Sequence, residues 1–249
     1  MPPIPATRLR TRLPWTTVPD VDVLRDLGKV VAFSPHLDDG VLSCGGLLSA
    51  CRDALVVTVF AGIPPDDLPL TDWDRRCGYG DGPGAMRGRR AEDVQALACL
   101  RARGLHLDFL DSQYGQPPAP ARLAFAMRAV LHRERPDTVL VPLGLFHADH
   151  LLVQEVAMKL RAEESGLLWL AYEDVPYRRK RGLLQHRLMR LYAQGVSATP
   201  AAFGHVPRAR RKAAAVAAYA SQLRPMGLAG GQGDPVLPER YWRLESGVE

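Results

Sequence analysis

The chain has 249 residues, of which 47% are hydrophobic and 24% are charged, with a formal net charge of +5. This is an ordinary globular composition, and no low-complexity linker divides the chain into two small domains. The arginine clusters favour solvated surface over nucleic-acid binding, because no aromatic-interleaved or helix-turn-helix pattern accompanies them.

The cysteine spacing and the N-terminal sequence indicate the cellular compartment that we expect for the protein. No cysteine pair has CxxC spacing, so we expect neither a structural zinc site nor a disulfide framework. The cysteines are Cys44, Cys51, Cys77 and Cys99. The N-terminal stretch lacks the apolar segment of a secretory signal, and no run reaches the roughly 18 apolar residues of a membrane span. We therefore predict a soluble, reduced, cytoplasmic protein.

Apolar runs alternate with helical patterns after an irregular lead-in over residues 1–20. In chain order, the expected elements are a strand at 29–35, a helix at 40–53, a strand at 54–62, a long Pro-, Gly- and Asp-rich loop at 63–84, a helix at 85–104, a strand at 105–111, a helix at 119–136, a strand at 137–144, a helix at 148–166 and a strand at 167–177.

The pattern after residue 178 is less regular. We expect a helix at 211–223, a loop at 227–235 and a short strand or helix at 239–244. The sequence therefore predicts a single domain, 1–249, with a core at about 22–177 and a C-terminal elaboration at 178–249. It does not indicate an oligomeric state.

The predicted strands are apolar throughout instead of alternating, which indicates a parallel sheet covered on both faces. With right-handed crossovers, the fold class is a Rossmann-like three-layer α/β/α sandwich with a mostly parallel sheet. Ligands of such sheets lie beyond the carboxyl ends of the strands. All five predicted strand ends carry acidic or histidine residues, in the segments SPHLDD, AGIPPDD, LDS, GLFHADH and YEDVPY.

The first and fourth strand ends offer metal ligands. His36 and Asp39 are three residues apart at a strand-to-helix turn, where both side chains can face one point. His147 or His150 can supply a third ligand, which gives the open His-Asp-His set of a catalytic zinc site. Fe²⁺ or Co²⁺ also suits such ligands. Asp38 is then free to act as the general base for a metal-bound water.

Each piece has a simpler explanation when taken alone. Asp38 or Asp39 could cap the following helix, and Asp149 could be an acid favoured by a helix N-terminus. Histidines early in a helix are often ordinary surface or core groups. The joint occurrence at two strand ends of one sheet favours the metal site. Cys44 is interpreted as a small buried residue.

Three motifs carry a resemblance to a known family. PHLDDGVLSCGG resembles the opening motif of the PIG-L/LmbE-like zinc-dependent deacetylases, HADH resembles their second motif, and RRAEDVQAL resembles their Arg-x-x-Glu-x-x-x-Ala helix. The similarity covers roughly residues 28 to 175. Leu37 replaces the usual proline and Gly40 a frequent glutamate or alanine; neither change removes a ligand or an acid-base group.

The resemblance implies hydrolysis of an N-acyl amide, most often an N-acetyl group on a glucosamine-like sugar. It assigns His36, Asp39 and His150 to zinc. It assigns the general base to Asp38, and stabilisation of the oxyanion, with protonation of the leaving amine, to His147. It also gives Asp149 the task of orienting a neighbouring imidazole.

The resemblance leaves the substrate contacts open. Arg89 lies near the expected basic rim and could bind the substrate, or pair with Glu92 or Asp93 on its own helix. Residues 63–84 and 178–210 are expected to form the substrate walls. Candidate aromatic contacts are Trp73, Tyr79, Tyr177 and Phe203, for each of which loop anchoring is the alternative.

We predict a hydrolase that removes an N-acetyl or other N-acyl group from a small amino-sugar substrate, a GlcNAc-type conjugate or a glycosylated secondary metabolite. An amidase that cleaves a larger thiol-sugar or other conjugate is the alternative. A non-catalytic sugar- or nucleotide-binding domain is disfavoured, because the first strand ends in two carboxylates that repel phosphate and no GxGxxG follows.

Overall fold

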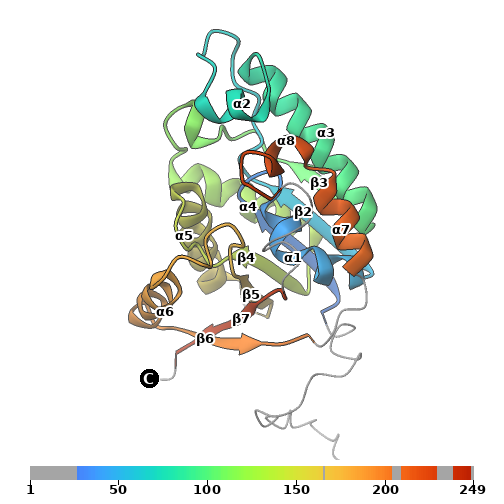
Figure 1. The fold of residues 1–249 in the computed structure, drawn as a ribbon. Helices are drawn as coiled ribbons and strands as arrows, with labels where there is room; N and C mark the ends of the chain where they lie inside the picture. Colours follow the sequence, from blue (N-terminus) through green and yellow to red (C-terminus); the bar gives the residue numbers. More distant parts are fainter. Residues whose placement is uncertain (1–26, 165, 204–208, 229–237, 248–249) are drawn as a thin grey trace, which may run out of the picture.

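The computed structural model describes residues 27–164, 166–203, 209–228 and 238–247, and its centre is one seven-stranded sheet (Figure 1). The strand order is β3-β2-β1-β4-β5-β7-β6. The strands are β1 (Lys29–Ser34), β2 (Asp53–Thr58), β3 (Arg103–His106), β4 (Thr138–Pro142), β5 (Leu168–Tyr172), β6 (Val196–Ala201) and β7 (Tyr241–Ser246). Only β7 runs antiparallel to its neighbours, so the predicted mostly parallel sheet is confirmed.

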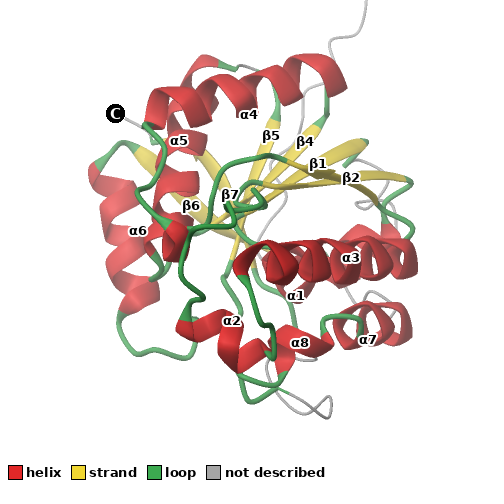
Figure 2. Cartoon of the chain, turned by 90° about the horizontal axis from the view of Figure 1, so that it is seen from above, coloured by secondary structure: helices red, strands yellow, loops and turns green. Residues whose placement is uncertain are grey.

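Helices cover both faces of the sheet, as the view from above shows (Figure 2). They are α1 (Asp39–Ala50), α2 (Asp72–Cys77), α3 (Gly82–Leu100), α4 (Pro120–Glu134), α5 (Ala148–Glu163), α6 (Leu183–Ala193), α7 (Ala209–Ala217) and α8 (Ala220–Leu223). Helices α1, α3 and α7 pack on one face, and α4, α5 and α6 on the other. This is the predicted three-layer sandwich.

Alternate residues of the central strand enter the two cores. Val31 and Phe33 of β1 pack under α4 and α5, whereas Val30 and Ala32 pack under α1 and α3. Successive side chains of a strand point to opposite faces, so a strand buried on both faces must be apolar at every position. The unbroken apolar runs of the sequence thus follow from the two layers of helices.

Several predictions about elements need correction. Residues 63–84 contain helix α2, which Thr71 caps by accepting a hydrogen bond from the Asp74 N–H, and α3 already begins at Gly82. The helix expected at 211–223 is two helices, α7 and α8. Helix α6 and strand β6 were not predicted, and the strand expected at 105–111 is β3, which ends at His106. The short strand or helix expected at 239–244 is strand β7, Tyr241–Ser246. The lead-in 1–20 and most of the loop 227–235 lie outside the described residues.

The sheet has one point where the direction of strand addition reverses. From β1 the chain moves to β2 and β3 on one side, then returns to β4 on the other side of β1. Such a switch point is the usual ligand site of open α/β sheets. The first two predicted motifs follow β1 and β4, and therefore meet there. Among the described residues, no helix is long and apolar enough to cross a membrane.

Candidate active site

The turn from β1 into α1 is held by a serine and by a glycine too small to clash. Ser34 donates from its hydroxyl to the His36 carbonyl (2.6 Å) and accepts from the Gly40 N–H (2.8 Å). A Cβ at position 40 would lie 3.2 Å from the Ser34 side chain. Gly40 therefore permits a close approach of α1 to the end of β1. Leu37 is buried and packs beside Met86 and Tyr114.

The three predicted metal ligands converge on one atom. The Oδ2 atom of Asp39 lies 3.1 Å from the Nδ1 of His36 and 3.0 Å from the Nε2 of His150. The Nε2 of His150 is buried and has no hydrogen-bond partner, so its short approach to Asp39 is not a hydrogen bond. Ligand atoms that face a common metal approach one another in this way.

Two carboxylates fix the outer nitrogens of these histidines. Asp149 accepts from the Nε2 of His36 at 2.9 Å, and Asp174 accepts from the Nδ1 of His150 at 2.6 Å. The inner nitrogens, His36 Nδ1 and His150 Nε2, are thereby left to present lone pairs toward Asp39. A carboxylate behind a metal-bound histidine commonly sets the tautomer in this manner.

The electrostatics of the cluster call for a cation. Burial lowers the pKa of His150, but Asp39 and Asp174 outweigh it and raise the pKa to about 9. The pKa of His36 also lies well above its usual value, since Asp111, Asp149 and Asp39 outweigh the effect of burial. Burial raises the pKa of Asp39, but His150 and His36 hold it well below its usual range. A metal ion supplies the same positive charge without protonating the histidines.

Asp38 is buried beside the cluster and has a free oxygen. It occupies the position before α1, but its side chain makes no capping hydrogen bond, so the capping alternative fails. Its Oδ2 atom has no hydrogen-bond partner. Burial and the neighbouring Asp39 raise the pKa of Asp38 to about 8. A nearby metal cation would lower this pKa toward neutrality, the range that suits a general base.

His147 stands at the N-terminus of α5 and caps that helix. Its Nδ1 accepts the Asp149 N–H at 3.3 Å, which leaves the proton on Nε2 when the ring is neutral. Burial and the neighbouring His36 lower the pKa of His147. The lowered pKa favours the neutral ring, in which Nε2–H remains a donor for an oxyanion.

Other combinations of these residues also come close together. The trios His36/His147/His150 and His36/Asp111/Asp149 each offer ligand atoms within 4.8 Å of one another. His147 already uses Nδ1 in the helix cap, and Asp111 uses both carboxylate oxygens on Gln113. Neither trio contains Asp39, whose Oδ2 faces both His36 and His150, and its role as a ligand stays a prediction.

Arg89 does not lie on an exposed rim. Its side chain is 3% exposed and donates to the buried Asp74 of α2 at 2.5 Å. It pairs with neither Glu92, which binds Ser221, nor Asp93, which binds His106 and Tyr219. The pair joins α2 to α3, and a role toward substrate stays a prediction.

The expected aromatic contacts fall into two groups. Tyr177 lies at the site: its ring stacks on His147 (6.4 Å between centroids) and meets His150 edge-on (5.3 Å). The other three pack within the fold, Trp73 under Arg76, Tyr79 against Gly88 and Phe203 against Tyr241. The anchoring alternative thus describes these three better.

Sequence reasoning gave Asp174 no role, although it lies in the fifth strand-end segment. It is fully buried, and its Oδ2 accepts from the N–H groups of Gly144 and Leu145 at 2.9 and 3.0 Å. The carboxylate thus holds both His150 and the loop that leads to His147. Its place at a strand end was the available signal; its partner could be seen only in the fold.

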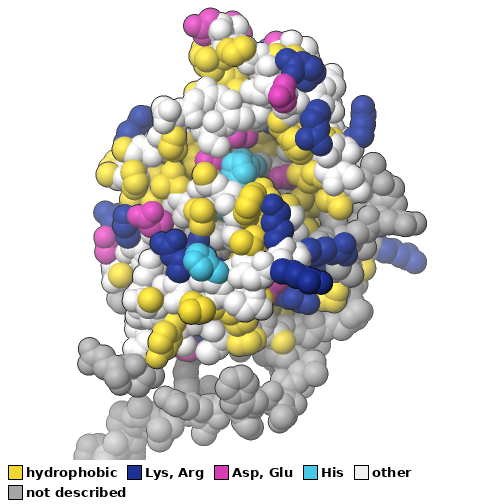
Figure 3. Space-filling model, turned by 60° about the vertical axis from the view of Figure 1, so that its left-hand side comes forward, with side chains coloured by type: hydrophobic (Ala, Val, Ile, Leu, Met, Phe, Trp, Pro, Cys, Tyr) yellow, Lys and Arg dark blue, Asp and Glu magenta, His cyan; other side chains and the backbone are white. Residues whose placement is uncertain are grey.

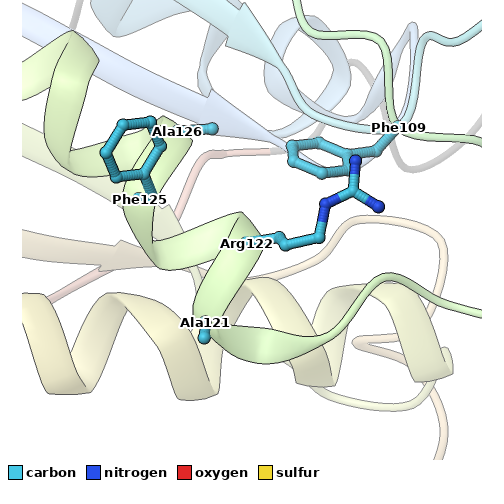
Figure 4. A pocket seen from close by; sticks show the side chains of 5 residues that line it. All are labelled: Phe109, Ala121, Arg122, Phe125 and Ala126. Atoms are coloured by element: carbon cyan, nitrogen blue, oxygen red, sulfur yellow. The ribbon is translucent and has the colours of Figure 1, made fainter.

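A surface pocket of about 380 Å³ lies on α4 and contains none of these residues (Figure 4). Its lining residues are Phe109, Ala121, Arg122, Phe125 and Ala126. The histidine cluster lies apart from this pocket, and a histidine side chain is visible in a hollow beside acidic ones (Figure 3). The chemistry points to this hollow, so we place the candidate active site there.

Comparisons with known proteins place the chain in a family. The PIG-L family model, described as GlcNAc-PI de-N-acetylase, matches residues 31–161. A 2'-N-acetylparomamine deacetylase of Streptomyces fradiae is 31% identical over 185 residues, which make up 66% of this chain and 64% of that protein. The chain thus spans less than two thirds of that relative.

Two solved structures share the fold over nearly their whole length. The A40926 pseudoaglycone deacetylase has a TM-score of 0.71 and 25% identity, covering 90% of this chain and 99% of its own. A triple mutant of a deacetylase from the teicoplanin biosynthetic pathway has a TM-score of 0.72 and 26% identity, covering 88% and 98%. The comparisons confirm the resemblance that the motifs indicated.

Proposed function

Because the chain belongs to the PIG-L family, we propose that it is a metal-dependent hydrolase that removes an N-acetyl group from an amino sugar. The substrate is a GlcNAc-type conjugate or a glycosylated secondary metabolite. The relatives named as deacetylases of paromamine and of a pseudoaglycone support this substrate class. The observation that carries the proposal is the buried, unpartnered Asp38 carboxylate beside the convergent His36, Asp39 and His150.

His36, Asp39 and His150 would hold the metal. The buried Nε2 of His150 without a partner and the nitrogen and oxygen donor set fit Zn²⁺, and Fe²⁺ or Co²⁺ suit the same ligands. When bound, such an ion supplies Lewis-acid polarisation of the amide carbonyl and acidification of a water molecule.

The remaining residues move and hold protons. Asp38 takes the proton of the attacking water at Oδ2, the oxygen that no protein group occupies, and passes it to the amine nitrogen as the C–N bond breaks. Neutral His147 donates from Nε2 to the oxygen of the tetrahedral intermediate. A well-placed donor of this kind contributes on the order of 10²–10³ in rate. Asp149 and Asp174 keep His36 and His150 in the correct tautomers.

An acyl-group panel tests the proposal. N-acetylglucosamine glycosides and analogues with longer N-acyl chains would be incubated with the Zn²⁺-loaded protein and with the chelated protein. We expect acetate release that depends on the metal. Release of longer acids without acetate would favour the amidase alternative. A metal-loaded protein that releases no acid from any compound would contradict the proposal.

A further inference from the structure

Positive charge is concentrated in one stretch of the sequence. Residues 175–233 hold 11 of the 32 basic residues and none of the 27 acidic ones, so the rest of the chain has a net charge of −6. The stretch begins directly after Asp174. Lysine and arginine side chains gather on the face that contains the histidine hollow (Figure 3). Arg187 and Lys212 of this stretch are buried, whereas Arg179, Lys180 and Arg181, close beyond Tyr177, are exposed. Exposed charges of one sign beside a site attract ligands of opposite charge.

A row of rings leads from the site to this basic stretch. Tyr177 stacks on His147, Phe146 lies 5.4 Å from Tyr177, and the Lys180 ammonium lies 3.4 Å from the centroid of the Phe146 ring. Phe146 is 50% exposed, so its ring face is accessible to a ligand at the edge of the site.

The backbone fixes this row in place. The N–H groups of Tyr177 and Arg178 both donate to the Asp174 carbonyl, at 2.9 and 3.0 Å. The same tight turn therefore aims the Asp174 carboxylate at His150 and the Tyr177 ring at the entrance. The row is positioned by the residue that also positions a metal ligand.

Lys180 lacks an acidic partner in the part of the chain that the structure describes, and Arg181 beside it is exposed. The two carboxylates nearest in the chain are engaged elsewhere, Asp174 with His150 and Glu173 with Trp242 and Arg240. An ammonium on a ring face keeps N–H donors free for a second partner. An exposed ring and a free cation together suit a ligand that is apolar and anionic.

We propose that Phe146, Tyr177 and Lys180 form a subsite for the aglycone of the substrate, and that this aglycone is aromatic or otherwise apolar and carries a negative charge. The inference rests on the proposed function and narrows it. It separates this protein from enzymes whose substrates are polycationic sugars, because a basic rim repels them.

Three N-acetylglucosaminides that differ in one charge test the subsite: the 4-carboxyphenyl, the 4-methylphenyl and the 4-aminomethylphenyl glycosides. We expect kcat/KM to rank them in that order at low ionic strength, with about two- to fivefold between neighbours, as for exposed charge pairs. The spread should shrink in about 0.5 M salt.

Two matched variants locate the effect. Lys180→Met should bring the ratio between the carboxyphenyl and methylphenyl glycosides close to one. Arg52→Met removes an equal charge from the opposite edge of the sheet, between α1 and β2, and should leave the ratio unchanged. Equal kcat/KM for all three glycosides in the wild type, or an unchanged ratio in Lys180→Met, would overturn the inference.

Binding separates this inference from the proposed function. Asp38→Asn should bind the glycosides without turnover, and their Kd values should follow the same ranking. If the wild type deacetylates none of them but the ranking of Kd values appears, the proposed reaction fails and the subsite stands. If neither binding nor turnover depends on the charge, the subsite fails.

Discussion

Asp174 shows how a residue that touches no substrate can set the chemistry of one that holds a metal. Its Oδ1 accepts the Nδ1 proton of His150 at 2.6 Å, and its other oxygen is saturated by two backbone N–H groups. The carboxylate therefore cannot rotate away, and His150 must present Nε2 to Asp39. Sequence reasoning reached His150 but not this partner, because the pair joins two strand ends 24 residues apart.

We expect Asp174→Asn to weaken metal binding by about 10–100-fold, since an amide cannot enforce the His150 tautomer. Competition with a chromogenic chelator measures this affinity directly, apart from turnover. Asp81→Asn, which alters an exposed cap of α3, is the control. An unchanged metal affinity in Asp174→Asn would contradict the assignment of His150 as a ligand held by Asp174.

Helix α2 is anchored by a buried ion pair within a stretch that we expected to be a loop. Asp74 is fully buried and accepts from Arg89 of α3 and from the hydroxyl of Tyr114, at 2.5 and 2.7 Å. The local signals for α2 were present, a threonine cap and the left-handed Gly78 at its end, but six residues are too few to show a hydrophobic period.

Removing one partner of this pair should be costly. We expect Asp74→Ala to lower the free energy of unfolding by about 3–5 kcal/mol, because Arg89 would be left as an uncompensated buried charge. Asp72→Ala breaks the exposed Arg75 pair on the same helix and should cost about 1 kcal/mol or less. Urea unfolding compares the two; similar losses would mean that the Arg89 pair is not buried in solution.

Glu134 at the end of α4 links three cations at the edge of the sheet opposite the site. Its carboxylate lies within 3.0 Å of Lys29, Arg103 and Arg133. The hydrogen bond with Lys29 has the largest effect on the pKa of Glu134. Burial opposes it, Arg103 adds to it, and together they lower this pKa from 4.5 to about 2.

The lowered pKa makes this contact pH-dependent. A carboxylate with a depressed pKa in the folded state stabilises the fold above its unfolded pKa, and the contribution disappears as the pH falls from about 4.5 to about 2. We expect the stability difference between the wild type and Glu134→Gln to shrink across this range. Thermal unfolding at several pH values checks it; a constant difference would contradict the pairing.

Across the whole molecule, the predicted elements agree best with the observed ones where unbroken apolar runs indicate the structure. Strands β1, β2, β4 and β5 could be predicted, because burial on both faces leaves an unbroken apolar signal. Strand β3 is half-exposed, and the strand expected at 105–111 lies instead at Arg103–His106. Helix α6 and strand β6 could not: α6 buries Arg187 on the Gly144 carbonyl, so its pattern looks polar. Long-range partners create that burial, and local periodicity does not show it.

The C-terminal elaboration is joined to the core, as the single predicted domain requires. Strands β6 and β7 extend the same sheet beyond β5. Glu239 accepts from the Gly46 and Leu47 N–H groups of α1 at 2.7 and 3.0 Å and from Lys212 of α7 at 2.6 Å. A Cβ at Gly46 would lie 3.0 Å from this carboxylate, so the glycine admits Glu239. The single domain itself stays a prediction.

The most direct test of the account is Asp38→Asn, assayed for metal content and for acetate release in the same preparation. Asp38 is predicted to move a proton and not to hold the metal. The variant should therefore carry as much Zn²⁺ as the wild type by elemental analysis and lose about 10²–10⁴ in rate. Wild-type rates of acetate release in the metal-loaded variant would contradict the division of labour between Asp38 and Asp39.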